Sequence, residues 1–175
     1  MKKSLISLLT VAVVLCCAIG GTVAWIMDKT GPVTNTFTVG DINIELTETT
    51  GDTYKMVPGN VLAKDPEVTV LSGSEACWLF VKVEASDNFD DFMEYEMADG
   101  WIALAGHPGI YYREVPATSA DTDFAIIKDN EVLVKDTVTK EMMNGESFEE
   151  PTLTFTAYAV QKDHIDTAAA AWEKL

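Results

Sequence analysis

Short stretches in which apolar and polar residues alternate, separated by turn residues at intervals of about 8–12 positions, constrain this chain more than any other feature. The longest stretch, residues 152–160, places apolar or small residues at odd positions and mostly threonine at even ones. Residues 41–47 alternate in the same way, with Ile42, Ile44 and Leu46 on the face that we expect to be half-buried. No alternation of strands with long helices occurs. The sequence therefore predicts a mostly β fold, an antiparallel β-sandwich or barrel.

Residues 76–85 form the most apolar of the predicted strands. Cys77 and Leu79 share one face, and Trp78 and Phe80 share the other. A strand that is apolar on both faces is either central in its sheet or covered by another element.

An alanine-rich stretch near the end of the chain predicts a short C-terminal helix over residues 167–174, with Asp166 as its N-cap. We expect Trp172 of this helix to pack on the sheet face that carries Trp78 and Phe80.

Two dipeptides predict tight turns between strands. Asp99-Gly100 separates the stretches 95–97 and 101–104, and Asp129-Asn130 separates two further apolar stretches. Asp-Gly favours the backbone conformation of a two-residue hairpin turn. We expect both dipeptides to close β-hairpins.

The chain is strongly acidic, with 28 acidic and 12 basic residues and a formal net charge of −16 at pH 7. Such a surface repels nucleic acid and anionic lipid headgroups, so nucleic-acid binding is excluded as a function. The densest group of oxygen ligands is Asp87, Asp90 and Asp91, which lacks the spacing and the glycine of an EF-hand loop. We predict no cofactor, and at most weak Ca²⁺ binding at these three residues.

Residues 1–24 have the parts of a secretory signal sequence. A pair of lysines precedes an apolar run, and a glycine pair then breaks the helix. Thr22 and Ala24 are small enough for the −3 and −1 pockets of a signal peptidase. We predict cleavage after Ala24, which leaves Trp25 as the first residue of a single mature domain, 25–175.

The alternative to cleavage is a retained membrane anchor, since residues 4–27 carry no charge and can span a bilayer. The glycine pair and the small residues after it favour cleavage and secretion. Lipid attachment at Cys16 is disfavoured because the bulky Leu15 precedes it. Cleavage removes two lysines and no acid, so 10 basic and 28 acidic residues give the mature chain a charge of −18.

The mature chain lacks the residue patterns of familiar catalytic sites. Cys77, its one cysteine, lies in an apolar stretch and is predicted to be a buried core thiol. His107 and His164 are far apart in the sequence, and both are predicted to lie in surface turns. H-E-x-x-H, C-x-x-C and G-x-S-x-G motifs are absent from the sequence. We therefore predict that the protein is not an enzyme.

Two segments near the N-terminus carry a family resemblance. Residues 20–28 read Gly-Gly-Thr-Val-Ala-Trp-Ile-Met-Asp, and residues 35–46 enter a strand through Thr-Phe-Thr-Val-Gly. This pattern resembles the signal and first strand of the TasA/camelysin family of Gram-positive exported proteins, which a SipW-type signal peptidase processes. Residues 54–59 and 154–172 look like those of small clostridial exported proteins with the same class of signal.

The resemblance implies a jelly-roll-like sandwich, secretion, and residence at the cell surface or in the biofilm matrix. It also implies self-assembly, because fibre-forming relatives donate the mature N-terminal segment as a strand to the next subunit. Here that segment is 25–39, a mobile N-terminal strand in this reading, and its usable part follows Pro32. The candidate assembly residues are Asn35, Thr36, Phe37, Thr38 and Val39.

The sequence therefore predicts an exported structural or interaction protein that forms homo-oligomers or fibres. Its expected contact with a membrane is through the uncleaved signal. Two alternatives stay open at this point. One is a secreted metal-dependent peptidase, which is the label of some family members, and the other is a monomeric module that presents acidic loops to a cationic partner.

Overall fold

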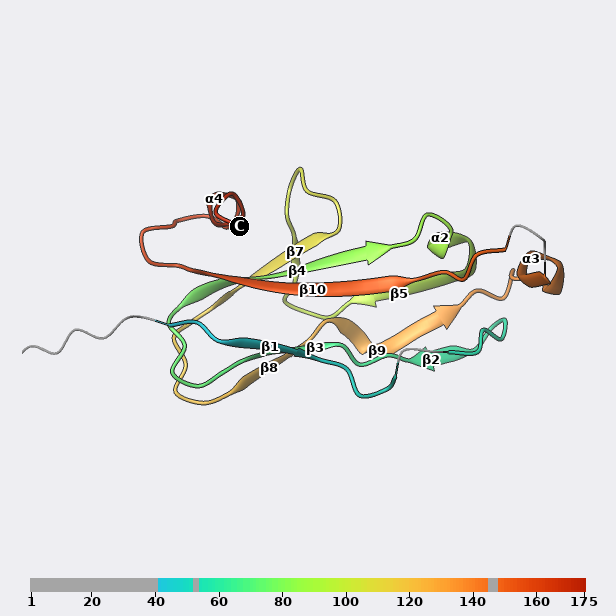
Figure 1. Ribbon diagram of the computed structural model, residues 1–175, viewed down its shortest axis with the longest axis horizontal. Coiled ribbons are helices and arrows are strands. Elements are labelled where there is room, and N and C mark those ends of the chain that lie inside the picture. Colours follow the sequence, from blue (N-terminus) through green and yellow to red (C-terminus); the bar gives the residue numbers. More distant parts are fainter. Residues whose placement is uncertain (1–40, 52–53, 145–147) are drawn as a thin grey trace, which may run out of the picture. The chain divides into compact units, whose positions relative to one another are not determined.

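The computed structural model describes residues 41–51, 54–144 and 148–175 (Figure 1). The predicted signal sequence, its recognition residues Thr22, Ala24 and Trp25, and the candidate assembly strand 35–39 lie outside these residues. A search of the described residues for a helix long and apolar enough to cross a membrane finds none.

The described part of the chain is built mainly from short strands, which confirms the predicted mostly β class. The strands are β1 (Ile44–Thr47), β2 (Val61–Ala63), β3 (Glu67–Val70), β4 (Cys77–Ala85), β5 (Met93–Met97), β6 (Ile102–Ala103), β7 (Ile110–Val115), β8 (Thr122–Ala125), β9 (Ile127–Val134) and β10 (Leu153–Gln161). The helices are α2 (Phe89–Phe92), α3 (Lys140–Asn144) and α4 (Ala168–Trp172).

The strands form three antiparallel sheets, with the orders β1-β3-β8, β10-β4-β7-β6 and β2-β9-β5. In Figure 1 the sheet that contains β4 lies over the sheet that contains β3, as in a sandwich. Since β4 lies between β10 and β7, the most apolar strand is central, which is one of the two alternatives that its sequence left open.

The main core fills the space between the layers. On β4, Cys77, Leu79 and Val81 are fully buried and face Val68 and Val70 of β3 in the same cluster. This is the face on which the alternation of the sequence placed Cys77 and Leu79.

A second, smaller core lies on the opposite face of β4 and is covered by α4. The ring centroids of Phe80 and Trp172 are 5.3 Å apart, and Ala171 is fully buried. The indole N–H of Trp78 donates a hydrogen bond of 3.0 Å to the carbonyl of Ile165, just before the helix. The predicted packing of the C-terminal helix on Trp78 and Phe80 is therefore confirmed.

The predicted N-cap of this helix is wrong by one residue. Thr167 is the N-cap, and its hydroxyl accepts a hydrogen bond of 3.2 Å from the backbone N–H of Ala170. Thr167 has the extended backbone that an N-cap needs, with φ −135° and ψ 147°. The helix therefore begins at Ala168, one residue later than predicted.

The turn at Asp99-Gly100 exists, but it does not close the hairpin that we predicted. Gly100 has φ 89°, a backbone conformation that favours glycine over residues with a side chain. β5 pairs with β9, whereas β6 pairs with β7. The turn therefore passes the chain from one sheet to another.

The second predicted hairpin, at Asp129-Asn130, is also wrong. Both residues have positive φ, 54° and 58°, as the dipeptide suggests, but both lie inside the single strand β9. Tyr95 of β5 pairs with Val132, and Met97 pairs with Ile127, so a step of two residues along β5 matches a step of five along β9. The dipeptide forms a bulge of three extra residues, because the segments on either side of it pair with the same neighbour.

We predict that Ala171→Asp lowers the free energy of unfolding by about 2–4 kcal/mol, because it places a charge without a partner under α4 or displaces the helix from its core. The matched control is Ala170→Asp, which puts the same side chain on the exposed first turn and changes stability by less than about 0.5 kcal/mol. Urea denaturation of both variants measures the difference. Equal destabilisation of the two would contradict the packing of α4 on this sheet.

Candidate functional site

β10 forms one edge of the sheet that contains β4, and it is the longest edge strand in the described residues. β10 pairs with β4 over nine residues, from Leu153 opposite Ala85 to Gln161 opposite Cys77. Within residues 41–51, 54–144 and 148–175, no strand pairs with its other side.

The two ends of this ladder show which backbone groups face outward. The N–H of Ser86 donates to the carbonyl of Thr152, and the N–H of Lys162 donates to the carbonyl of Ala76. Since antiparallel pairs alternate along a strand, the even residues of β10 direct N–H and C=O toward β4. The odd residues direct theirs to the open side; they are Leu153, Phe155, Ala157, Ala159 and Gln161.

The side chains near this edge are incompletely covered. Phe155 and its odd neighbours on β10 face the main core but are only partly buried, whereas Leu79 and Val81 of β4 are fully buried. On the other layer, Leu46 of β1 pairs with the buried Val68 and yet is 38% exposed. Ile42 and Ile44 are partly buried against the main core, so the predicted half-buried face of this segment is confirmed, and Leu46 is its most exposed member because β1 is itself an edge strand.

A groove of about 430 Å³ opens on this side of the sandwich, beside the first residues of β10. Its walls come from both layers and from α2 and α3. The apolar side chains that line it are Met56, Leu62, Phe89, Met93, Val132, Met143, Phe148, Pro151 and Leu153. Tyr54, Lys64 and Glu150 add polar groups. A volume of this size is typical of ligand pockets, which lie between about 300 and 1,000 Å³.

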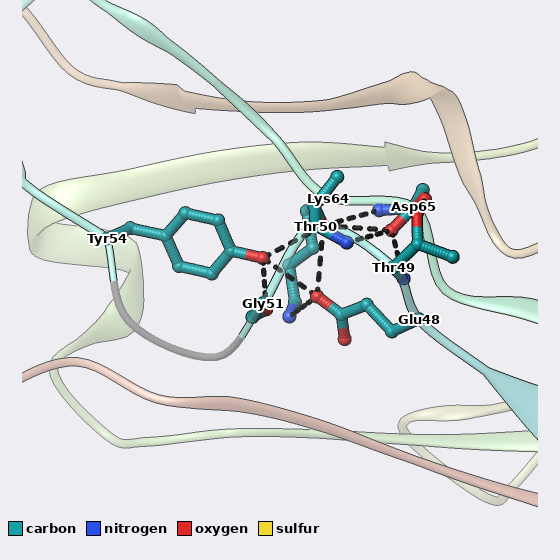
Figure 2. Close-up of polar contacts among 7 residues, drawn as sticks. All are labelled: Glu48, Thr49, Thr50, Gly51, Tyr54, Lys64 and Asp65. Atoms are coloured by element: carbon teal, nitrogen blue, oxygen red, sulfur yellow. Dashed lines mark hydrogen bonds and ion pairs between the residues drawn. The ribbon is translucent and has the colours of Figure 1, made fainter.

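Asp65 holds the chain beside the groove by accepting hydrogen bonds from two adjacent threonines (Figure 2). The backbone N–H groups of Thr49 and Thr50 each donate to its carboxylate at 2.9 Å, and both threonine hydroxyls donate as well. These bonds, led by that from the Thr49 hydroxyl, hold the pKa of Asp65 well below its usual range.

Glu48 organises two of the polar residues of the groove, Tyr54 and Lys64. Its Oε1 accepts hydrogen bonds from Nζ of Lys64 at 2.7 Å and from the hydroxyl of Tyr54 at 2.8 Å (Figure 2). The ammonium of Lys64 also lies 5.3 Å from the ring centroid of Tyr54 and 5.7 Å from that of Phe155. Lys64 therefore bridges the polar network and β10, and its charge is already paired.

The other side of the sandwich shows a different arrangement. Arg113 of β7 lies with its guanidinium carbon 4.1 Å from the ring centroid of Phe124 on β8 and 5.2 Å from that of Trp101. These contacts join the two layers at that side. The two sides of the sandwich thus differ: the groove lies on the side bounded by β10, and Arg113 packs between aromatic rings on the side bounded by β8.

The residues that sequence analysis considered for catalysis do not come together. Cys77 is buried, as predicted, and burial raises the pKa of its thiol to about 11, which keeps it protonated at neutral pH. The side chain of His164 is 93% exposed and 3.3 Å from Asp163, which confirms its surface position. His107 is only partly exposed, because it packs edge-on against Trp172 with ring centroids 6.2 Å apart.

The acidic cluster is not gathered into a metal site. Asp90 and Asp91 lie in α2, and Asp87 precedes it. In the described part of the chain, no group of three or more His, Cys, Asp or Glu side chains is arranged to hold a metal ion. Weak Ca²⁺ binding at these residues stays a prediction without geometric support.

Sequence analysis missed both the open edge and the groove. One signal for the edge was available, because residues 153–161 contain neither a charge nor a proline. The groove gave no comparable signal, since Met56, Leu62 and Phe148 come from segments far apart in the sequence and meet only in the folded chain.

Comparison with known proteins adds no assignment. No protein-family model, no curated protein and no solved structure matches this chain.

We predict that Asp65→Asn destabilises the protein at pH 7 and that this difference shrinks as the pH falls below about 4, the ordinary pKa of an aspartate. Because folding lowers the pKa of Asp65, its stabilising contribution is present above that pH and is lost during acidification toward the lowered value. Urea denaturation at pH 7, 5 and 3 measures the difference in stability between Asp65→Asn and the unchanged chain. Asp136→Asn, at an exposed position, is the control for loss of one charge. A difference that is the same at pH 7 and pH 3 would contradict the role of the ionised carboxylate.

Proposed function

We propose that this chain is an exported, non-enzymatic structural protein of the cell surface or biofilm matrix, and that it associates with copies of itself by strand addition. The observation that carries the proposal is the open side of β10, which offers the N–H and C=O groups of alternate residues along nine positions. An extended segment that pairs with such an edge gains main-chain hydrogen bonds, and its side chains provide specificity.

The charge pattern of the edge strands supports β10 as the acceptor. Natural proteins protect sheet edges with charged residues or keep the edge strands short. Acidic residues interrupt β1 at Glu45, β5 at Glu94 and Glu96, and β8 at Asp123. β2 and β6 are uncharged but have three and two residues. Among the edge strands of the described residues, β10 is both long and uncharged.

The donor that we propose is the segment 35–39 of a second copy. Residues 36–39 read Thr-Phe-Thr-Val and repeat the alternation of residues 152–155, Thr-Leu-Thr-Phe, at the start of β10. A strand of this pattern added to β10 continues its apolar face and its threonine face. The resemblance to the TasA/camelysin family, whose fibre-forming members donate this segment, supports the same assignment.

The excess of acidic residues sets the condition for association. A mature charge of −18 repels other copies at neutral pH, but residues 30–40 and β10 are uncharged, so the two contacting segments add no repulsion of their own. Protonation of carboxylates at lower pH reduces the general repulsion. Assembly is therefore expected to increase from pH 7 to pH 4.

The test compares three purified chains by size-exclusion chromatography and light scattering between pH 4 and 7. We predict that chains 25–175 and 35–175 form large assemblies, and that chain 40–175, which lacks the donor, stays monomeric. Chain 35–175 is the control for shortening the N-terminus without removing the donor. Strand addition is refuted if chain 25–175 stays monomeric at high concentration throughout this pH range, or if chain 40–175 assembles equally well.

A further inference from the structure

The groove beside β10 has no role in the strand addition described so far. We propose that it receives the side chain of Phe37 from the strand that a second copy adds to β10. This inference rests on the proposed function and adds the contact that fixes where the incoming strand lies.

The groove and the open edge are continuous. Leu153 is the first residue of β10 and also lines the groove. Lys64 also lines the groove, and its ammonium lies 5.7 Å from the ring centroid of Phe155. Phe155 is the next residue of β10 whose backbone N–H and C=O face the open side. Paired residues on neighbouring strands direct their side chains to the same face of a sheet. An apolar residue added beside Leu153 or Phe155 therefore points into the groove.

The lining of the groove suits an aromatic side chain. Met56, Met93 and Met143 supply flexible thioethers, which make favourable contacts with aromatic rings, and Phe89 and Phe148 supply ring surfaces. The one ammonium in the lining, that of Lys64, is paired with Glu48 at 2.7 Å, so the groove offers no free charge to attract an anionic group. In the segment 35–39, Phe37 is the aromatic residue, and it shares its face with Val39.

Chain length excludes Phe37 of the same molecule as the occupant. The carbonyl of Asp41 accepts a hydrogen bond from Glu75, and the adjacent Ala76 accepts one from Lys162, so Asp41 lies near the end of β10. The groove lies at the other end of the strand, nine residues from Lys162, or about 30 Å away. Phe37 is four residues from Asp41 and reaches at most about 14 Å of chain. A second copy has no such limit.

Photo-crosslinking tests the contact directly. Chain 25–175 with benzoylphenylalanine at position 37 is mixed with an isotope-labelled chain 25–175 and irradiated after assembly. Benzophenone reacts readily with methionine, so we expect cross-links between copies at Met56, Met93 or Met143. The matched control places the probe at position 38, whose side chain points to the opposite face, and is expected to give none at these residues.

A second measurement does not depend on the probe. We predict that Phe37→Ala raises the concentration needed for assembly by at least about tenfold, since it removes a buried aromatic side chain from the contact. Thr38→Ala is the control and is expected to change the concentration needed for assembly by less than about threefold. Two results would overturn the inference and leave strand addition intact. In the first, chain 25–175 assembles but the cross-links form at other residues or within one chain. In the second, Phe37→Ala assembles at the same concentration as Thr38→Ala. Failure of chain 25–175 to assemble would instead refute the proposed function itself.

Discussion

The antiparallel ladder between β4 and β10 is the interaction on which the rest of the structure depends. It places the most apolar strand at the centre of its sheet, so that one face of β4 builds the main core and the other builds the smaller core under α4. The same ladder leaves the odd residues of β10 with outward N–H and C=O groups. A backbone group without a partner is tolerated at an edge because water can reach it, and for the same reason it is available to another strand.

The positions of charged residues distinguish the β10 edge from the rest of the surface. With 28 acidic residues, the chain repels its own copies over most of its surface. β10 contains no charged residue along its nine positions, although Lys82 and Glu84 on the neighbouring β4 form an ion pair of 2.7 Å. Beside the groove, Lys64 is paired with Glu48, and the carboxylate of Asp65 accepts hydrogen bonds from Thr49 and Thr50. In the assembly that we propose, charge limits where copies can meet, and the uncharged edge is the place that it leaves open.

Local pattern predicted much of the fold, and pairing between distant segments decided what it did not predict. The alternation in residues 152–160 placed β10 and its core face correctly, and the apolar character of Trp78 and Phe80 correctly predicted a cover. Asp129-Asn130 has the positive φ angles of a hairpin turn, but pairing of both flanking segments with β5 makes it a bulge. Sequence spacing carries no information about which strand becomes the neighbour, and the open edge and the groove are both consequences of that choice.

Hydrogen exchange measured residue by residue on β10 tests the central claim most directly. In chain 40–175, the amides of Phe155, Ala157 and Ala159 should exchange fast, while those of Thr154, Thr156 and Tyr158 are protected by their bonds to β4. In assemblies of chain 25–175, the odd amides should become as slow as the even ones. Odd amides that are already protected in chain 40–175, or that stay fast after assembly, would contradict β10 as the acceptor strand.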